Sequence, residues 1–232
     1  MGASLERDAE KCARFSAKIP LQTIESDRCH DFWIDPIQNH RDLGTSASSS
    51  LPDNFCRKAP ALSQLILRGL SRAHSQGKLC LLSRHLPCAI GRGGRRPKQR
   101  EGDGITPLGR WPVREVLYRA DRIIRPRTTL PVKTIRPDDG WCDAPTDGNY
   151  NRPVKLPYPV SHERLWRDDS LYDLVVVLGY NDRPRSLARG SAIFMHLARP
   201  GYTPTAGCIA LSRPDMLILL ARLKPGDSVI IP

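Results

Sequence analysis

The chain has 232 residues, 40% hydrophobic and 26% charged, which is the ordinary composition of a globular protein with one good core or two small ones. Its net charge of +12 is uneven, because residues 1–60 carry 8 basic and 9 acidic side chains and the remaining 172 residues carry 28 and 15. The sequence contains no apolar run of about 18 residues, so no membrane span is expected. No nucleic-acid-binding motif accompanies the basic charge, so no nucleic-acid partner is expected either.

The first 60 residues read as an N-terminal extension rather than as a domain. They lack sustained periodicity, apart from a possible short helix over residues 4–18, and residues 44–54 form a polar, turn-rich linker. The first fifteen residues carry charges where a secretory signal peptide needs an apolar core, so no signal peptide is visible. The folded domain is therefore expected to span residues 61–232.

From residue 61 onwards, short strand-like runs are broken by Gly and Pro. Residues 62–70 and 77–91 alternate apolar and polar side chains, which predicts an opening meander, and residues 106–120 continue the sheet. Residues 91–104 are basic and glycine-rich without the spacing that binds phosphate, which indicates a mobile surface loop. Residues 125–166 are rich in Pro, Asp, Asn and Arg and predict a long irregular section that serves as a lid or substrate wall.

The last third of the chain predicts three closely spaced strands, a helix and a final strand. The strands fall within residues 171–181, 190–198 and 206–212. The helix, over residues 213–223, has an apolar stripe and a capping serine directly before it. The sequence therefore predicts a mostly β fold, a sandwich or barrel with one packing helix.

A histidine and a cysteine in this last third have the spacing of a catalytic pair. His196 and Cys208 are twelve positions apart on neighbouring predicted strands, and Gly207 directly precedes the cysteine. A thiol with a pKa of roughly 8.5 needs a base to act as a nucleophile, and a glycine lets backbone N–H groups approach an oxyanion. The alternatives are an inert buried cysteine and a core histidine, and a lone cysteine is more often inert.

Several segments in order resemble the L,D-transpeptidase catalytic domain (YkuD-like) over about residues 62–232. The family motif is a histidine, a gap and Ser/Thr-x-Gly-Cys, which corresponds here to His196, Thr205, Ala206, Gly207 and Cys208. Residues 103–113, residues 175–182 and the C-terminal KPGDSVIIP add to the resemblance. Many members have a histidine directly before the Gly-Cys pair and an Arg or Asn two positions after the cysteine. Ala206 and Ala210 stand there instead, which matches a shorter, divergent, proteobacterial-type branch.

The resemblance implies that Cys208 is the nucleophile, that His196 is its base and that a backbone carbonyl holds the imidazole. It also assigns Gly207, Thr205, Tyr180 and Asn181 to the oxyanion or the substrate. A plain turn explains Thr205 and Asn181 nearly as well.

The implied substrates are peptidoglycan stem peptides in the cell envelope or periplasm, and the implied reaction is cross-linking, with hydrolysis as a carboxypeptidase side activity. Carbapenem acylation and a role in cell shape and wall organisation would accompany it. No metal or other cofactor is implied.

Other hypotheses and residues stay open on the sequence alone. A degenerate domain that binds peptidoglycan or another anionic polymer without turnover is the alternative function, and a nucleic-acid binder ranks last. Arg152 and Tyr150 lie in the predicted lid, where they would meet a carboxylate. His162 is expected at the surface or bracing a loop, and a second histidine of the cleft is the alternative. Of the seven cysteines, Cys88 and Cys142 either pair or are small buried hydrophobic side chains.

Overall fold

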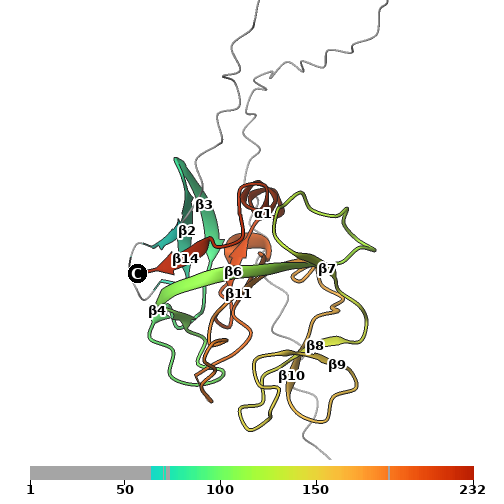
Figure 1. Ribbon diagram of the computed structural model, residues 1–232. Helices are drawn as coiled ribbons and strands as arrows, with labels where there is room; N and C mark the ends of the chain where they lie inside the picture. The colour runs from blue at the N-terminus through green and yellow to red at the C-terminus, as the bar shows by residue number, and fades with distance from the viewer. Residues whose placement is uncertain (1–63, 70, 72–73, 188) are drawn as a thin grey trace, which may run out of the picture. The chain divides into compact units, whose positions relative to one another are not determined.

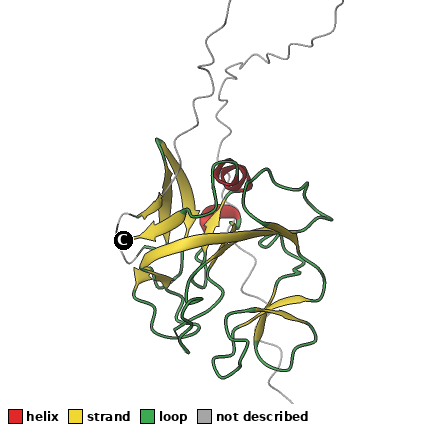
Figure 2. Cartoon of the chain, in the orientation of Figure 1, coloured by secondary structure: helices red, strands yellow, loops and turns green. Residues whose placement is uncertain are grey.

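A computed structural model describes residues 64–69, 71, 74–187 and 189–232. The short helix and linker expected near the N-terminus, and the predicted domain boundary at residue 60, lie outside these residues. Most of the regular elements in the described part are strands, as Figure 2 shows, and they are joined by long loops, one α-helix and a short 3-10 helix, η1 (Pro200–Tyr202). No helix in the described part is long and apolar enough to cross a membrane.

The main sheet closes on itself into a barrel. Its strand order is β11-β12-β13-β3-β2-β1-β14-β6-β7, and β11 also pairs with β6, which closes the ring from β11 to β6 and, among the described strands, leaves β7 paired to β6 alone. This arrangement confirms the expected mostly β fold and makes it a barrel. The strands of this sheet are β1 (Gln64–Arg68), β2 (Gln76–Leu81), β3 (Arg84–Ala89), β6 (Gly109–Tyr118), β7 (Val132–Thr134), β11 (Leu174–Leu178), β12 (Phe194–Leu197), β13 (Ile209–Leu211) and β14 (Ser228–Ile231).

The predicted elements recur in this barrel. β1, β2 and β3 form the expected antiparallel meander, and β11, β12 and β13 are the expected run of neighbouring strands. Helix α1 (Arg213–Leu220) follows β13 and starts at Ser212, whose hydroxyl accepts a hydrogen bond from the Asp215 amide. The helix ends three residues before the predicted end, although Leu223 beyond it is still buried.

The section over residues 125–166, which the sequence predicted to be irregular, contains four short strands between its loops. It contains β7 and a separate three-stranded sheet of order β10-β8-β9 (Figure 1). Strands of three or four residues are too short to show a clear alternation, which is why the pattern missed them. The bounds of the remaining strands are β4 (Arg95–Arg96), β5 (Thr106–Pro107), β8 (Asp139–Cys142), β9 (Pro153–Lys155) and β10 (His162–Arg164).

Two apolar clusters cover the two faces of β11. Leu174, Val176 and Leu178 point into the barrel core, and Val175 and Val177 belong to a second cluster on the outer face. Trp141 of β8 and Leu165, directly after β10, are members of that second cluster. A strand buried on both faces needs a continuous apolar run, which explains the sequence LVVVL. Cys208 also belongs to the outer cluster, so this packing positions the candidate site.

Candidate active site

Two parallel strands bring the predicted histidine and cysteine to one face of the sheet. His196 of β12 lies opposite Ala210 of β13, and Cys208 precedes Ala210 by two positions. Because side chains alternate along a strand, Cys208 and Ala210 point to the same side. Diagonal neighbours of this kind have Cα atoms about 7–8 Å apart, within reach for a histidine. Both His196 and Cys208 line one cavity of about 260 Å³.

The Cys208 thiol is buried, with 8% of the residue exposed, and it is held by two backbone groups. Its Sγ donates to the Ala192 carbonyl at 3.2 Å and accepts from the Phe194 amide at 3.4 Å. Burial raises the pKa of the Cys208 thiol to about 12. The thiol is therefore protonated at neutral pH in the free protein.

The His196 imidazole is equally buried and is oriented by a backbone carbonyl, as expected. Its Nδ1 lies 2.8 Å from the Leu197 carbonyl oxygen. Because a carbonyl only accepts, Nδ1 carries the proton in the neutral ring, and Nε2 keeps its lone pair. Burial lowers the pKa of His196 to about 4, so the ring is neutral at pH 7 and able to take a proton. The Tyr172 ring packs edge-on against the imidazole, with centroids 5.4 Å apart.

Gly207 has a conformation that only glycine adopts readily. Its φ is +143°, and a Cβ at this position would lie 2.9 Å from the Ile105 carbonyl oxygen. The Thr106 hydroxyl donates to the Gly207 carbonyl at 2.9 Å. In a trans peptide the next N–H points away from that carbonyl, so Thr106 sets the direction of the Cys208 amide.

A family comparison matches this chain from the residue before β2 to the end of its last strand. The family model for the L,D-transpeptidase catalytic domain, YkuD, matches residues 75–231. The chain belongs to this family. No curated protein and no solved structure matches the chain.

Within this L,D-transpeptidase domain, Thr205 supports the loop that leads to the cysteine. Its hydroxyl accepts from the Gly207 amide at 3.1 Å and donates to the Cys208 carbonyl at 2.6 Å. Its backbone also exchanges hydrogen bonds with Ile90 and Arg92. The Gly207 amide is thus occupied, which leaves the Cys208 amide as the better candidate of the two for an oxyanion donor.

Tyr180 and Asn181 lie outside the cavity of the transpeptidase domain that holds Cys208. The Tyr180 hydroxyl donates to the Arg189 carbonyl, and the Asn181 amide group donates to the Ser186 and Gly190 carbonyls at 2.9 Å each. Asn181 has a left-handed backbone, with φ of +48°, as a turn residue does. The two residues therefore hold the loop between β11 and β12, and they line a different cavity.

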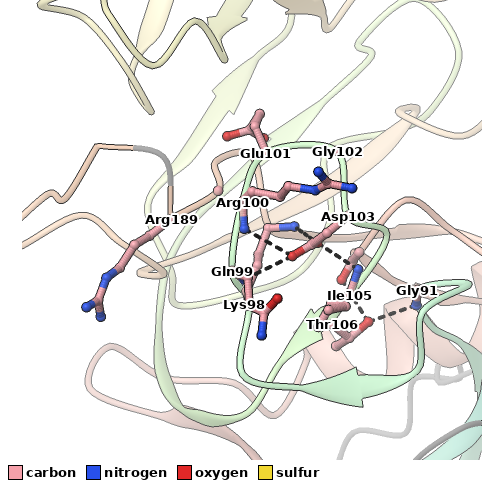
Figure 3. Close-up of polar contacts among 12 residues, drawn as sticks. Gly91, Lys98, Gln99, Arg100, Glu101, Gly102, Asp103, Ile105, Thr106 and Arg189 are labelled. Atoms are coloured by element: carbon pink, nitrogen blue, oxygen red, sulfur yellow. Dashed lines mark hydrogen bonds and ion pairs between the residues drawn. The ribbon is translucent and has the colours of Figure 1, made fainter.

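The loop over residues 91–104 is anchored, contrary to the prediction of a mobile surface loop. Figure 3 shows Asp103 at the centre of a set of contacts, with Lys98 2.6 Å away in an ion pair whose side chains are 2% and 9% exposed. Asp103 also accepts from the backbone amides of Gln99 and Ile105, both at 3.0 Å. The residues of this loop are mostly polar, so the sequence predicts exposure. The ion pair is buried because segments distant in the sequence pack on the loop.

Tyr150 and His162, from the section predicted as a lid, make hydrogen bonds within the protein. Tyr150 is 1% exposed, and its hydroxyl contacts Glu101 and the Gly190 amide, so it ties the 91–104 loop to the segment before β12. Arg152 is exposed and borders another cavity. His162 is half-buried on β10, with Nδ1 2.7 Å from the Val160 carbonyl oxygen. Cys88 and Cys142 are free and buried.

The sequence analysis missed the charged wall of the Cys208 cavity. Glu163 of β10 lines it, and Arg167 donates to Glu163 at 3.3 Å and to both oxygens of Asp169 at 2.8 Å. Burial raises the pKa of Glu163, and the charge of Arg167 opposes that effect. Arg92 and Arg199 add two further guanidinium groups to the wall. No local signal distinguishes these arginines from the many others in the chain.

The described residues hold no group of three or more His, Cys, Asp or Glu side chains that would ligate a metal. The arrangement that remains is a buried thiol, a neutral imidazole, a backbone amide beside the thiol and a wall with both signs of charge. These are the parts that acyl transfer through a thioester uses.

Proposed function

We propose that the protein is a cysteine-dependent L,D-transpeptidase that acts on peptidoglycan stem peptides. The observation that carries the proposal is that His196, on β12, and Cys208, directly before the parallel partner strand β13, line one cavity. Membership of the family supports the general reaction class. The cell envelope is the proposed location, because that is where the substrate lies.

In the proposed acylation, His196 Nε2 takes the proton of the Cys208 thiol, and the sulfur attacks the carbonyl of the third residue of a tetrapeptide stem. The Cys208 amide donates to the oxyanion of the tetrahedral intermediate. When the intermediate collapses, the C–N bond to the terminal D-alanine breaks, and the amine of D-alanine leaves with the proton from His196. A thioester on Cys208 remains.

The proposed second half-reaction regenerates the thiol. An amine of a neighbouring stem attacks the thioester carbonyl, His196 takes the proton from that amine, and the C–S bond breaks as the new amide forms. The sulfur recovers its proton from His196. Water in place of the amine would give the free acid, which is the carboxypeptidase side activity. The guanidinium groups of Arg92 and Arg199 are suited to the carboxylates of the stems.

The raised pKa of Cys208 and the lowered pKa of His196 describe the resting state of this site. Neither group carries charge before the substrate arrives. Proton transfer then accompanies attack rather than preceding it, so the reaction does not depend on a standing thiolate population.

The deciding test is intact-mass analysis of the full chain after incubation with a carbapenem, with Cys208→Ala as the matched control. A stoichiometric adduct on the wild type alone supports the acyl-enzyme, and purified disaccharide tetrapeptides then report cross-linking. If folded wild-type protein forms no adduct and no cross-links, the enzyme proposal fails and a peptidoglycan-binding domain without turnover takes its place.

A further inference from the structure

Exposed apolar side chains gather around helix α1. Four large apolar residues are exposed in the described part of the chain, and three of them border this helix: Leu82, Ile124 and Leu217, which are 60%, 93% and 42% exposed. Each comes from a different element, namely the β2–β3 turn, the β6–β7 connection and α1 itself. Chance exposure of single residues would scatter them over the molecule.

Two cavities place these elements on either side of the helix. Leu82 and Arg84 line one of them together with Arg222, and Ile124 lines the other together with Leu217. Ala221 borders both cavities, so they flank the same end of α1. Figure 1 shows the β2–β3 hairpin and the β6–β7 connection on opposite sides of the helix.

Five exposed arginines surround the three apolar residues. None of the five takes part in an ion pair among the described residues, and no acidic side chain lines either cavity. The charge of this surface is therefore not neutralised within the described part of the chain. The five are Arg84, Arg125, Arg127, Arg213 and Arg222. We call these eight side chains the α1 face.

We propose that the α1 face docks the protein onto a lipid bilayer rich in anionic phospholipid. Arginines near such a bilayer are attracted to its phosphate groups, and long side chains reach the headgroups while apolar tips enter the boundary with the acyl chains. A nucleic acid or a soluble anionic polymer would use the arginines alone and would not require Ile124 at a loop tip, nearly fully exposed.

The α1 face is separate from the Cys208 cavity. None of its eight residues lines that cavity, and Cys208 precedes β13 whereas α1 follows it. This proposal therefore does not depend on the proposed reaction, and substitutions on the α1 face leave the site of acylation unchanged.

The test is co-sedimentation of the full chain with vesicles of phosphatidylcholine alone or with a third of phosphatidylglycerol, at about 50 and 300 mM salt. One variant reverses charge (Arg125→Glu, Arg127→Glu and Arg213→Glu), and another removes the apolar tips (Ile124→Asp and Leu217→Asp). The matched controls reverse three exposed arginines elsewhere (Arg136→Glu, Arg164→Glu and Arg183→Glu) and change the fourth exposed apolar residue (Leu187→Asp). Circular dichroism and thermal unfolding verify that each variant folds.

The wild type and the controls are expected to bind the anionic vesicles and not the neutral ones. The charge reversal is expected to weaken binding at least about a hundredfold, since it changes three arginines and each arginine at such a surface contributes about a fivefold change. Absence of wild-type binding to anionic vesicles at low salt overturns the proposal, whatever the variants do. An equal loss in the control triple, or full binding by the folded Ile124/Leu217 variant, overturns it as well, because either result indicates attraction by net charge alone.

Discussion

Thr106 and Gly207, 101 positions apart in the chain, are joined by a 2.9 Å hydrogen bond from the threonine hydroxyl to the glycine carbonyl. The same hydroxyl accepts from the Gly91 amide at 2.8 Å, and Thr106 has no exposed surface. One side chain of β5 thus fixes both the peptide bond that leads into Cys208 and the start of the 91–104 loop.

Replacement of Thr106 by valine, which has nearly the same shape, should lower the free energy of unfolding by about 1–3 kcal/mol, because two backbone groups lose their partner. It should also slow acylation by a carbapenem, because the Cys208 amide is no longer held in one direction. Urea unfolding and a time course of intact mass measure the two effects. Thr129→Val, which removes a hydroxyl bonded to the Leu223 carbonyl, should leave the acylation rate unchanged. Normal acylation by Thr106→Val would contradict the role given to Thr106.

Alkylation of Cys208 by iodoacetamide should be slow at pH 7 and rise about tenfold for each pH unit up to at least pH 10. Burial raises the pKa of this thiol to about 12, and only the thiolate reacts. Peptide mass spectrometry follows the modification of Cys208 separately from the other cysteines. The same cysteine in urea-unfolded protein is the control, since there it should titrate near its ordinary value. A rate that levels off below pH 9 in the folded protein would show that the thiol is not stored in its neutral form.

Glu163→Gln should make Cys208 alkylation severalfold faster at a fixed alkaline pH. The negative charge of Glu163 contributes to the raised pKa of Cys208, so the neutral amide lets the thiolate form more readily. Asp138→Asn is the matched control, because Asp138 is paired with Lys155 at the surface and is not part of the cavity. If both variants change the rate equally, the effect is general and the charge of Glu163 is not responsible.

The stability of the protein should fall as the pH falls from about 6.5 to 4, and His196 should account for part of the fall. The pKa of His196 is lowered to about 4 by burial, whereas an unfolded chain titrates near 6.5. In that window the unfolded state binds a proton that the folded state does not, so protonation favours unfolding by up to about 3 kcal/mol.

Guanidinium unfolding at pH 7, 5.5 and 4 measures this contribution as the difference between wild type and His196→Gln. The variant should lose less stability over the window than the wild type does. His85→Gln, at an exposed histidine of β3, should behave like the wild type. Parallel stability profiles for wild type and His196→Gln would rule out the linkage.

Asp103→Asn should destabilise the fold by about 3–5 kcal/mol, because it leaves the buried Lys98 ammonium without its anion. The exposed pair of Asp138 and Lys155 offers the comparison, and Asp138→Asn should cost about 0–1 kcal/mol. Urea unfolding measures both. A similar small loss in the two variants would mean that the 91–104 loop is not anchored by this ion pair.

The sequence predicted the strands of the main sheet apart from β7, and it predicted that His196 and Cys208 lie on neighbouring segments. Long apolar runs such as that of β11 and the Gly-Cys motif are local signals, and His196 lies on β12, a strand that the apolar residues around it predict. The contacts of Thr106 and the position of Glu163 depend instead on segments that meet only in the folded chain. Glu163 lies on a strand of three residues inside a section rich in turn formers, where periodicity carries almost no information.

The anchored 91–104 loop was missed for a related reason. Its composition is that of a solvated turn, whereas the Lys98 side chain of the ion pair packs against Gly190, in the segment before β12. Charged residues are exposed on average. A buried ion pair is an exception, and the sequence does not reveal it because its partners meet only in the folded chain.

The apolar cluster around Cys208 has a consequence for chemical durability. Peroxides attack the thiolate and reach it through solvent, whereas this sulfur is protonated, bonded to the Ala192 carbonyl and 8% exposed. The idle protein should therefore resist oxidation to sulfenic acid. The packing of the small β8–β10 sheet against β11 would then shield the Cys208 sulfur and keep it reduced in oxidising surroundings until a ligand occupies the cavity.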